Sequence, residues 1–305
     1  MKADSEGETV TGRLIFILLL SLSPTADAAG IFPPRQSTAE SGRAFLERTK
    51  HYDRTRREEA ILRAVLAGNV PDHLRRTVPV NFRIRTAGGL LPVRLQVLPD
   101  YLAIGSDTDF VRIPVDFYTA AALATRLHMS LPTRALVDRI WQASAIHTRP
   151  HPLPPGQAMT SNLWIGRHQD RAETRLRHLP AYQPGKLVAG HKKDLVLCAR
   201  LLAHPGRVPV YGWHHPDGRP LQPLSLVHTA DYADYSHGLR LISRTILVDG
   251  RPMDLHTILQ DPGLGPALAG EYIRESEHLV QKYAARRLPH PRLTAALRAF
   301  SALAH

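Results

Sequence analysis

Hydrophobic positions recur with two different periods along this chain. Residues 40–67 carry apolar side chains at helical spacing, and Gly68 is placed to cap the end of that helix. From Val78 to Val115 apolar residues alternate with polar ones, which is the period of a half-buried strand. This alternation predicts strands at 80–85, 91–97 and 110–115.

The remaining pattern mixes helices with short extended runs. Helices are expected at 118–128, 133–145, 161–179, 255–260, 271–287 and 292–304. The segment 186–203 combines an extended piece with a helical one. Strands are expected at 208–213, 220–227 and 239–248, with a turn at 216–218. The pattern predicts an α+β fold with mostly antiparallel strands and a strand-rich C-terminal half.

A proline-rich stretch divides the chain. Residues 147–158 contain four prolines, which is typical of a linker. We therefore expect an N-terminal α+β region at 29–146 and a C-terminal α+β region at 159–305, the latter with the candidate site. No internal repeat is visible on either side of the linker.

The first 28 residues have the order of a cleavable signal peptide. A largely apolar run from Leu14 to Leu22 follows Arg13 and precedes a small-residue tract with Ala26 and Ala28. The run is too short for a membrane-spanning helix, which needs roughly 20 residues, whereas the two alanines match an A-x-A cleavage site. We expect cleavage after Ala28, a secreted or periplasmic protein, and no stable transmembrane segment after cleavage.

The mature chain is strongly basic. Removing residues 1–28 takes away two basic and four acidic residues, which raises the formal charge from +12 to +14. Such a charge favours anionic partners. The arginines are nevertheless scattered, without a block of five or more basic residues and without a zinc-finger or RNP pattern. We expect no nucleic-acid partner, and suspect cell-envelope glycan or peptidoglycan instead.

The single cysteine, Cys198, has no partner for an intramolecular disulfide. It lies in an apolar run at 195–199. A reactive thiolate needs an electropositive and partly exposed setting. The sequence therefore predicts a buried, inert thiol.

Residues suited to proton transfer gather between positions 191 and 240. Histidine titrates near neutral pH, and a neighbouring carboxylate can orient its ring and tune its basicity. The candidate catalytic residues are His191, Asp194, His228, Asp234, Ser236 and His237. The candidate substrate-binding residues are Tyr211, Trp213, His214, Tyr232 and Arg240.

A metal site is one interpretation of this cluster. His228, Asp234 and His237 have the composition of a catalytic zinc centre, in which three protein ligands leave one position for water. His191 or His214 would be a further ligand. No H-E-x-x-H spacing supports the assignment.

Hydrolysis without a metal is the second interpretation, so the cofactor is either none or zinc. His237 or His228 is then the base, and Asp194 or Asp234 orients it. Ser236 is the candidate nucleophile, although no G-x-S-x-G elbow surrounds it.

Two further interpretations involve no catalysis. In the first, aromatic side chains stack on sugar rings while basic ones hold an anion. Its residues are Tyr211, Trp213, Tyr232, Tyr235, Lys192, Lys193 and Arg240. In the second, the His and Asp side chains satisfy buried backbone groups and the tyrosines pack in the core.

The segment Ser236-His237-Gly238-Leu239-Arg240-Leu241 resembles the signature of L,D-transpeptidases. In that family a Ser-His-Gly-Cys unit precedes an arginine, and an upstream histidine helps to activate the thiol. The resemblance implies that His228 corresponds to the upstream histidine. The nucleophilic cysteine is absent here, so the acyl-enzyme of that family cannot form. As a whole, the mature chain resembles uncharacterised secreted bacterial proteins, which implies no activity.

These observations favour a secreted hydrolase-like protein that acts on cell-envelope material, peptidoglycan or polysaccharide, through a His/Asp site. The substrate follows mainly from the expected location. A non-catalytic envelope or glycan-binding protein, and a structural or interaction module, stay open as alternatives.

Overall fold

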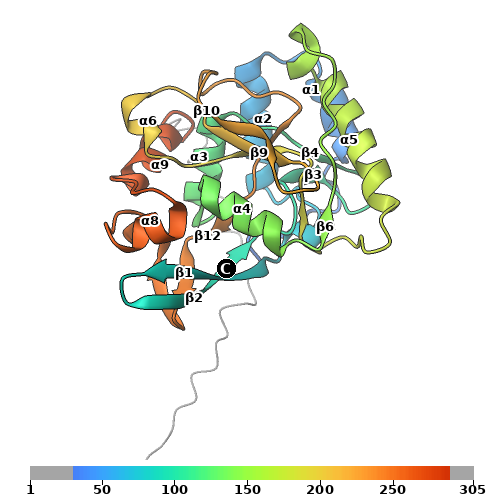
Figure 1. The fold of residues 1–305 in the computed structure, drawn as a ribbon. Helices are drawn as coiled ribbons and strands as arrows, with labels where there is room; N and C mark the ends of the chain where they lie inside the picture. The colour runs from blue at the N-terminus through green and yellow to red at the C-terminus, as the bar shows by residue number, and fades with distance from the viewer. Residues whose placement is uncertain (1–29, 289–305) are drawn as a thin grey trace, which may run out of the picture.

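The computed structural model describes residues 30–288. The predicted signal peptide at 1–28 and the predicted helix at 292–304 therefore lie outside the described residues. Helices packed around mostly antiparallel sheets confirm the α+β prediction (Figure 1). No helix within residues 30–288 is long and apolar enough to cross a membrane.

The predicted helical region at 40–67 consists of two helices rather than one. Helix α1 (Gly42–Thr49) begins at Ser41, and α2 (Arg54–Leu66) begins at Asp53. Each of these two side chains accepts a backbone N–H of its own helix's first turn. Gly68 follows α2 with a φ of 78°, which confirms the predicted glycine cap.

The larger sheet has the strand order β14-β13-β2-β12-β5, and β1 pairs with β2 beside it. Its strands are β1 (Val78–Thr86), β2 (Gly89–Val97), β5 (Met129–Ser130), β12 (Ile242–Ser243), β13 (Thr245–Val248) and β14 (Arg251–Asp254). The β1–β2 hairpin alternates as predicted, because Val80 and Ile84 are buried whereas Arg83 and Arg85 are exposed.

A smaller sheet carries most of the candidate site. Its order is β10-β9-β8-β11. The strands are β8 (Lys193–Leu195), β9 (Val210–His214), β10 (Pro220–Ser225) and β11 (His237–Gly238). Strand β8 is antiparallel to β9 and parallel to β11. Gly218, with a φ of 84°, lies in the predicted turn between β9 and β10.

Helices cover these sheets (Figure 1). Four helices after α2 lie close to their predicted positions: α3 (Phe117–Arg126), α4 (Arg134–Ala143), α5 (Asn162–Arg177) and α7 (Leu255–Leu259). The structure also contains η1 (Asp72–Leu74), β3 (Ala103–Gly105), β4 (Phe110–Arg112), β6 (Ile146–His147), η2 (Gln157–Thr160), β7 (Val188–Ala189), α6 (Arg200–Ala203) and α8 (Leu264–Ala269). The helix expected at 271–287 is shorter, because α9 spans only Ser276–Ala284.

The single long strand predicted at 239–248 is wrong. The chain there leaves the smaller sheet after β11 and enters the larger one through β12 and β13. Leu239, Leu241 and Ile242 are all buried on the way. The apolar run continues through the change of sheet, so its pattern does not reveal the break.

The proline-rich segment 147–158 joins two parts of the chain that share one core. It begins in β6, which pairs in parallel with β7, and its Leu153 is buried in that core. The larger sheet takes β1, β2 and β5 from the N-terminal region and β12 to β14 from the C-terminal region.

A buried ion network fixes α5 against β4 and the loop after β2. The Arg112 guanidinium donates to Asp100 Oδ2 from Nε at 2.8 Å and to Glu173 Oε2 from Nη1 at 2.9 Å. Both Arg112 and Asp100 are buried. Burial alone would raise the pKa of Asp100, but Arg112 and His191 hold it well below its ordinary value.

We predict that Arg112→Met lowers the free energy of unfolding by about 3–5 kcal/mol, because it leaves the buried Asp100 carboxylate without its main partner. Arg177→Met is the matched control, since Arg177 also pairs with Glu173 but is exposed. Its expected cost is below about 1 kcal/mol. Urea unfolding measures both, and equal costs would contradict the assignment.

Candidate functional site

The pairing of β8 with β9 and β11 brings several predicted site residues side by side. Two rows cross these strands: His237, Lys193 and Gly212 form one, and Gly238, Asp194 and Tyr211 form the next. Segments that are far apart in sequence thus meet on one sheet.

An Asp–His pair forms at this sheet. His214 Nε2 lies 2.9 Å from Asp138 Oδ1, and the Tyr211 hydroxyl donates to the same oxygen at 2.8 Å. Asp138 comes from α4, where its neighbour Val137 packs with Val196 and Tyr211. Because a carboxylate oxygen accepts hydrogen bonds, His214 donates from Nε2, and in the neutral form of the ring Nδ1 is the acceptor.

Asp194 faces His214 across a glycine. A Cβ on Gly212 would lie 3.4 Å from Asp194 Oδ2 and 3.4 Å from His214 Nδ1. Gly212 has a φ of 101°, a conformation that favours glycine. Asp194 Oδ2 and His214 Nδ1 therefore both border the space that a side chain at position 212 would occupy.

Burial raises the pKa of Asp194 to about 6, although Arg240 and the Tyr101 hydroxyl both favour the ionised form. Tyr101 donates to Asp194 Oδ2 at 2.8 Å. A carboxyl with this pKa exchanges its proton near neutral pH. His214 Nδ1 can accept a proton and Asp194 can donate one. General acid–base catalysis requires one group of each kind.

Trp141 flanks this pair. Its ring stacks on His147 at a centroid distance of 4.3 Å and lies 5.7 Å from the His214 ring. A Cβ on Gly218 would come within 3.0 Å of the same indole. The side chains of Trp141 and His147 are half-buried, whereas Asp138 is 38% exposed and His214 only 3%. The pair reaches the surface through Asp138.

Two predicted site residues are part of the interior. Arg240 donates to the carbonyls of Leu98 and Val188 at 2.7 and 2.6 Å, so its guanidinium is not presented to a substrate. His191 Nε2 lies 3.1 Å from Asp100 Oδ1 but outside hydrogen-bond geometry. Burial lowers the pKa of His191 to about 4.

Asp234 and Ser236 form a local turn rather than a catalytic triad. Asp234 Oδ1 accepts the Ser236 N–H at 2.7 Å and the Ser236 hydroxyl at 2.6 Å. That hydroxyl is therefore directed at a carboxylate and not at a histidine. Burial alone would raise the pKa of Asp234, but His237 and Ser236 lower it.

His237 is buried beside this turn. Neither of its ring nitrogens has a hydrogen-bond partner among the described residues. Burial lowers the pKa of His237 to about 4, so the ring is neutral at neutral pH. Tyr232 meets it edge-on at a centroid distance of 5.7 Å.

His228 and Tyr232 form a stacked pair at the surface, with ring centroids 4.1 Å apart. The proposed metal ligands are His228, Asp234 and His237. Within residues 30–288, no three or more His, Cys, Asp or Glu side chains form a group that could hold a metal ion. The zinc assignment of these three residues stays a prediction.

The basic and aromatic residues in β8 and β9, and Lys192 just before β8, are mostly buried. Lys192 is buried and donates to the Tyr235 carbonyl at 2.7 Å, and burial lowers its pKa to about 7. Lys193 Nζ lies 5.3 Å from the ring centroid of Trp213, which is itself buried. Only the half-buried Lys193 is partly accessible.

Cys198 is buried in the core, and burial raises the pKa of its thiol to about 11. This setting agrees with the predicted inert thiol.

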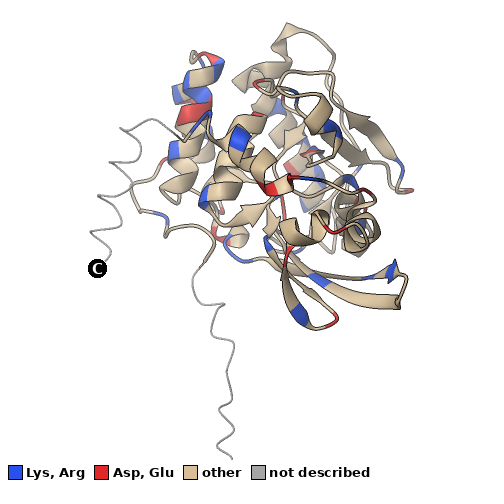
Figure 2. Ribbon diagram, turned by 90° about the vertical axis from the view of Figure 1, so that its left-hand side faces the viewer, with Lys and Arg blue, Asp and Glu red and all other residues tan. Residues whose placement is uncertain are grey.

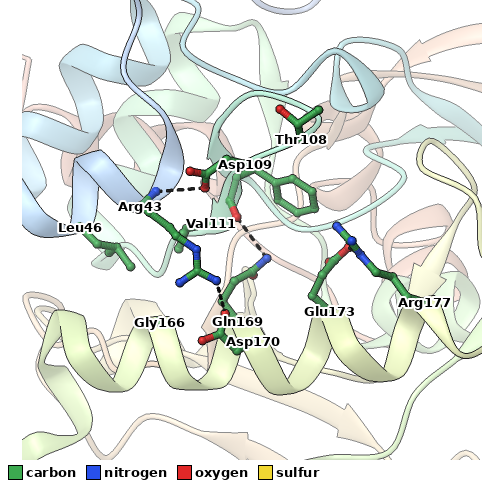
Figure 3. Close-up of a pocket in the computed structure, with 11 residues that line it drawn as sticks. Arg43, Leu46, Thr108, Asp109, Val111, Gly166, Gln169, Asp170, Glu173 and Arg177 are labelled. Atoms are coloured by element: carbon green, nitrogen blue, oxygen red, sulfur yellow. Dashed lines mark hydrogen bonds and ion pairs between the residues drawn. The ribbon is translucent and has the colours of Figure 1, made fainter.

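A separate cavity of about 300 Å³ lies between α1 and α5 (Figure 3). Its polar side chains already form ion pairs and hydrogen bonds within the protein. Arg43 pairs with Asp170 at 2.6 Å, and the Gln169 amide donates to the Phe110 carbonyl at 3.2 Å. Arg177 pairs with Glu173. We assign no function to this cavity.

Sequence reasoning missed Asp138 and Tyr101, which contact His214 and Asp194 directly. Asp138 lies 76 residues before its histidine, inside an amphipathic helix, and Tyr101 lies 93 residues before its carboxylate. No local spacing signals contacts of this kind.

We predict that Asp194→Asn changes how stability depends on pH. In the unfolded chain this carboxyl ionises near 3.8, and in the folded protein near about 6. Between those values the folded state binds more protons, so Asp194 costs stability as the pH rises through this window. Asparagine can still accept the Tyr101 hydroxyl but does not titrate. Relative to wild type, the variant gains up to roughly 3 kcal/mol by pH 7. Unfolding free energies from pH 3 to 8 measure this, and a constant difference would contradict it.

Comparisons with known proteins add no assignment: no family model, curated protein or solved structure matches this chain. The likeness of residues 236–241 to the L,D-transpeptidase signature stays an interpretation of six residues.

Proposed function

We propose that this protein is a hydrolase with an acid–base site at His214, Asp138 and Asp194. The observation that carries the proposal is that His214 pairs with one carboxyl group and borders the space above Gly212 together with a second one. One of them orients the ring at 2.9 Å. The other lies across Gly212 and has a pKa raised to about 6. Two carboxyl groups in different environments can take different roles.

The hydrolytic step follows from these protonation states. His214 Nδ1 takes a proton from a water molecule while the water oxygen forms a bond to the scissile centre. The bond to the leaving group breaks, and protonated Asp194 gives its proton to that group. His214 is then positively charged and Asp194 negatively charged. His214 then releases its extra proton to water and Asp194 takes up a proton from water, which restores both residues.

Asp138 acts through His214. Its carboxylate holds the Nε2 proton and stabilises the positive ring that forms during the step. The Tyr211 hydroxyl, which donates to the same oxygen at 2.8 Å, fixes the carboxylate in turn. We assign both residues to positioning.

Cell-envelope material is the proposed substrate. The expected signal peptide supports this choice, and the charge of +12 suits anionic wall components. Peptidoglycan and polysaccharide both contain bonds that a water molecule and an acid–base pair can cleave.

Non-catalytic glycan binding is a second candidate, because His214 and Asp194 are almost fully buried. The surface pair His228 and Tyr232 would then provide the binding surface, with the Arg54 guanidinium 5.7 Å from the Tyr232 ring centroid. Tyr232→Ala would weaken binding in that case, while His214→Gln would leave it unchanged.

The test measures soluble fragments released from purified peptidoglycan and wall polysaccharide. We expect His214→Gln to lower the rate by at least about 100-fold, since it removes the proton acceptor. Asp138→Asn should lower the rate less and shift its pH profile, because the His214 tautomer is no longer fixed.

His215→Gln is the matched control, since His215 is the next residue and only its backbone takes part in the turn, where its N–H donates to the Arg219 carbonyl. Its rate should equal that of wild type. Unfolding curves establish that each variant is folded. The proposal fails if wild type releases nothing from either material, or if His214→Gln remains fully active.

A further inference from the structure

Three arginines on the outer face of the larger sheet have no partner in the described part of the chain. Arg83 and Arg85 lie on β1 and Arg94 lies on β2, and all three are exposed. Within residues 30–288 none of them forms a hydrogen bond or an ion pair with another side chain. Arg112 and Arg240, by contrast, are buried and form hydrogen bonds inside the protein.

The strand register places these three side chains on one face. Asn81 pairs with Arg94, and Arg83 pairs with Pro92, so Arg83 and Arg94 are diagonal neighbours. Arg83 and Arg85 are two residues apart on one strand, a separation of roughly 7 Å. Like charges this close repel each other and destabilise the sheet. The fold itself gains nothing from keeping them together.

The face is hollowed between the guanidinium groups. A groove of about 450 Å³ is lined by Asn81, Arg83, Pro92, Arg94, Leu247 and Gly250, among others. Pro92 and Leu247 give it apolar surface between Arg83 and Arg94. Asp249, in the adjoining turn, forms no ion pair with these arginines in the described part of the chain and donates its backbone N–H to the Pro92 carbonyl.

Figure 2 shows that the β1–β2 and β13–β14 hairpins project together from the body of the protein, with basic residues along them. Among the strands of residues 30–288, β1 pairs only with β2. The groove is therefore accessible along its length to an extended ligand.

We infer that this face binds an acidic polysaccharide, a chain that carries a carboxylate or phosphate on successive repeats. The planar guanidinium matches either anion through two parallel hydrogen bonds. The apolar floor suits the carbon face of a sugar ring. A groove favours a chain over a flat membrane surface, on which apolar side chains would have to project beyond the arginines. The inference does not depend on the acid–base site.

Binding of labelled polygalacturonate to the purified protein tests the inference, with neutral dextran as the uncharged comparison. The variant Arg83→Gln/Arg85→Gln/Arg94→Gln should bind polygalacturonate at least about tenfold more weakly, and wild-type binding should weaken with salt. Because these side chains have no partners in the described chain, the unfolding midpoint should not change. Dextran should bind neither protein.

The matched control is Arg126→Gln/Arg149→Gln/Arg167→Gln, which removes the same charge from three exposed positions elsewhere. It should bind as wild type does. An equal loss in this control would overturn the inference in favour of net charge alone. Failure of wild type to bind polygalacturonate would overturn it outright. Loss of binding to phosphatidylglycerol vesicles in the first variant, with polygalacturonate binding intact, would assign the face to a membrane instead.

Discussion

The compensation of buried charge around Arg240 is the constraint on which the two sheets depend. Its guanidinium donates to the carbonyl of Leu98, which follows β2, and to that of Val188 in β7, while its Nε lies 4.0 Å from Asp194. One side chain thus ties the smaller sheet to the larger one. Since an uncompensated buried charge costs several kcal/mol, the chain must keep all three partners in place.

Burial also brings acids and bases closer in proton affinity. Removal from water disfavours every charged form, so it raises the pKa of a carboxyl and lowers that of an imidazole. Here it raises the pKa of Asp194 to about 6 and lowers those of His191 and His237 to about 4. Groups whose pKa values lie close together exchange protons at little cost. One physical cause therefore favours the neutral forms of buried acids and of buried bases alike.

The sequence predicted what depends on neighbouring residues. The glycine cap at Gly68, the β1–β2 hairpin, the turn at Gly218 and the α+β class all follow from local spacing, and the structure confirms them. The location of candidate residues near 191–240 also came from local composition. The role of each residue depends on its burial, which long-range pairing decides. From the sequence, Arg240 was expected to be accessible to a substrate, but its side chain is only 1% exposed.

Asp138, the partner of His214, also could not be identified from local sequence. Asp138 looks like an ordinary polar position of an amphipathic helix, and only the packing of Val137 on Tyr211 turns it toward β9. The change of sheet within 239–248 could not be predicted for a similar reason. A buried apolar run has the same pattern in either sheet.

Helix α4 separates the acid–base site from the basic sheet face. Asp138 contacts His214, whereas the next residue, Arg139, lies over the ring of Phe82 on β1 at 5.6 Å. Phe82 belongs to the inner face of the hairpin, with Val80 and Ile84, and the free arginines belong to its outer face. A polymer on the outer face would therefore lie one layer away from the helix that orients His214. Asp138 itself is 38% exposed on the other side of this layer.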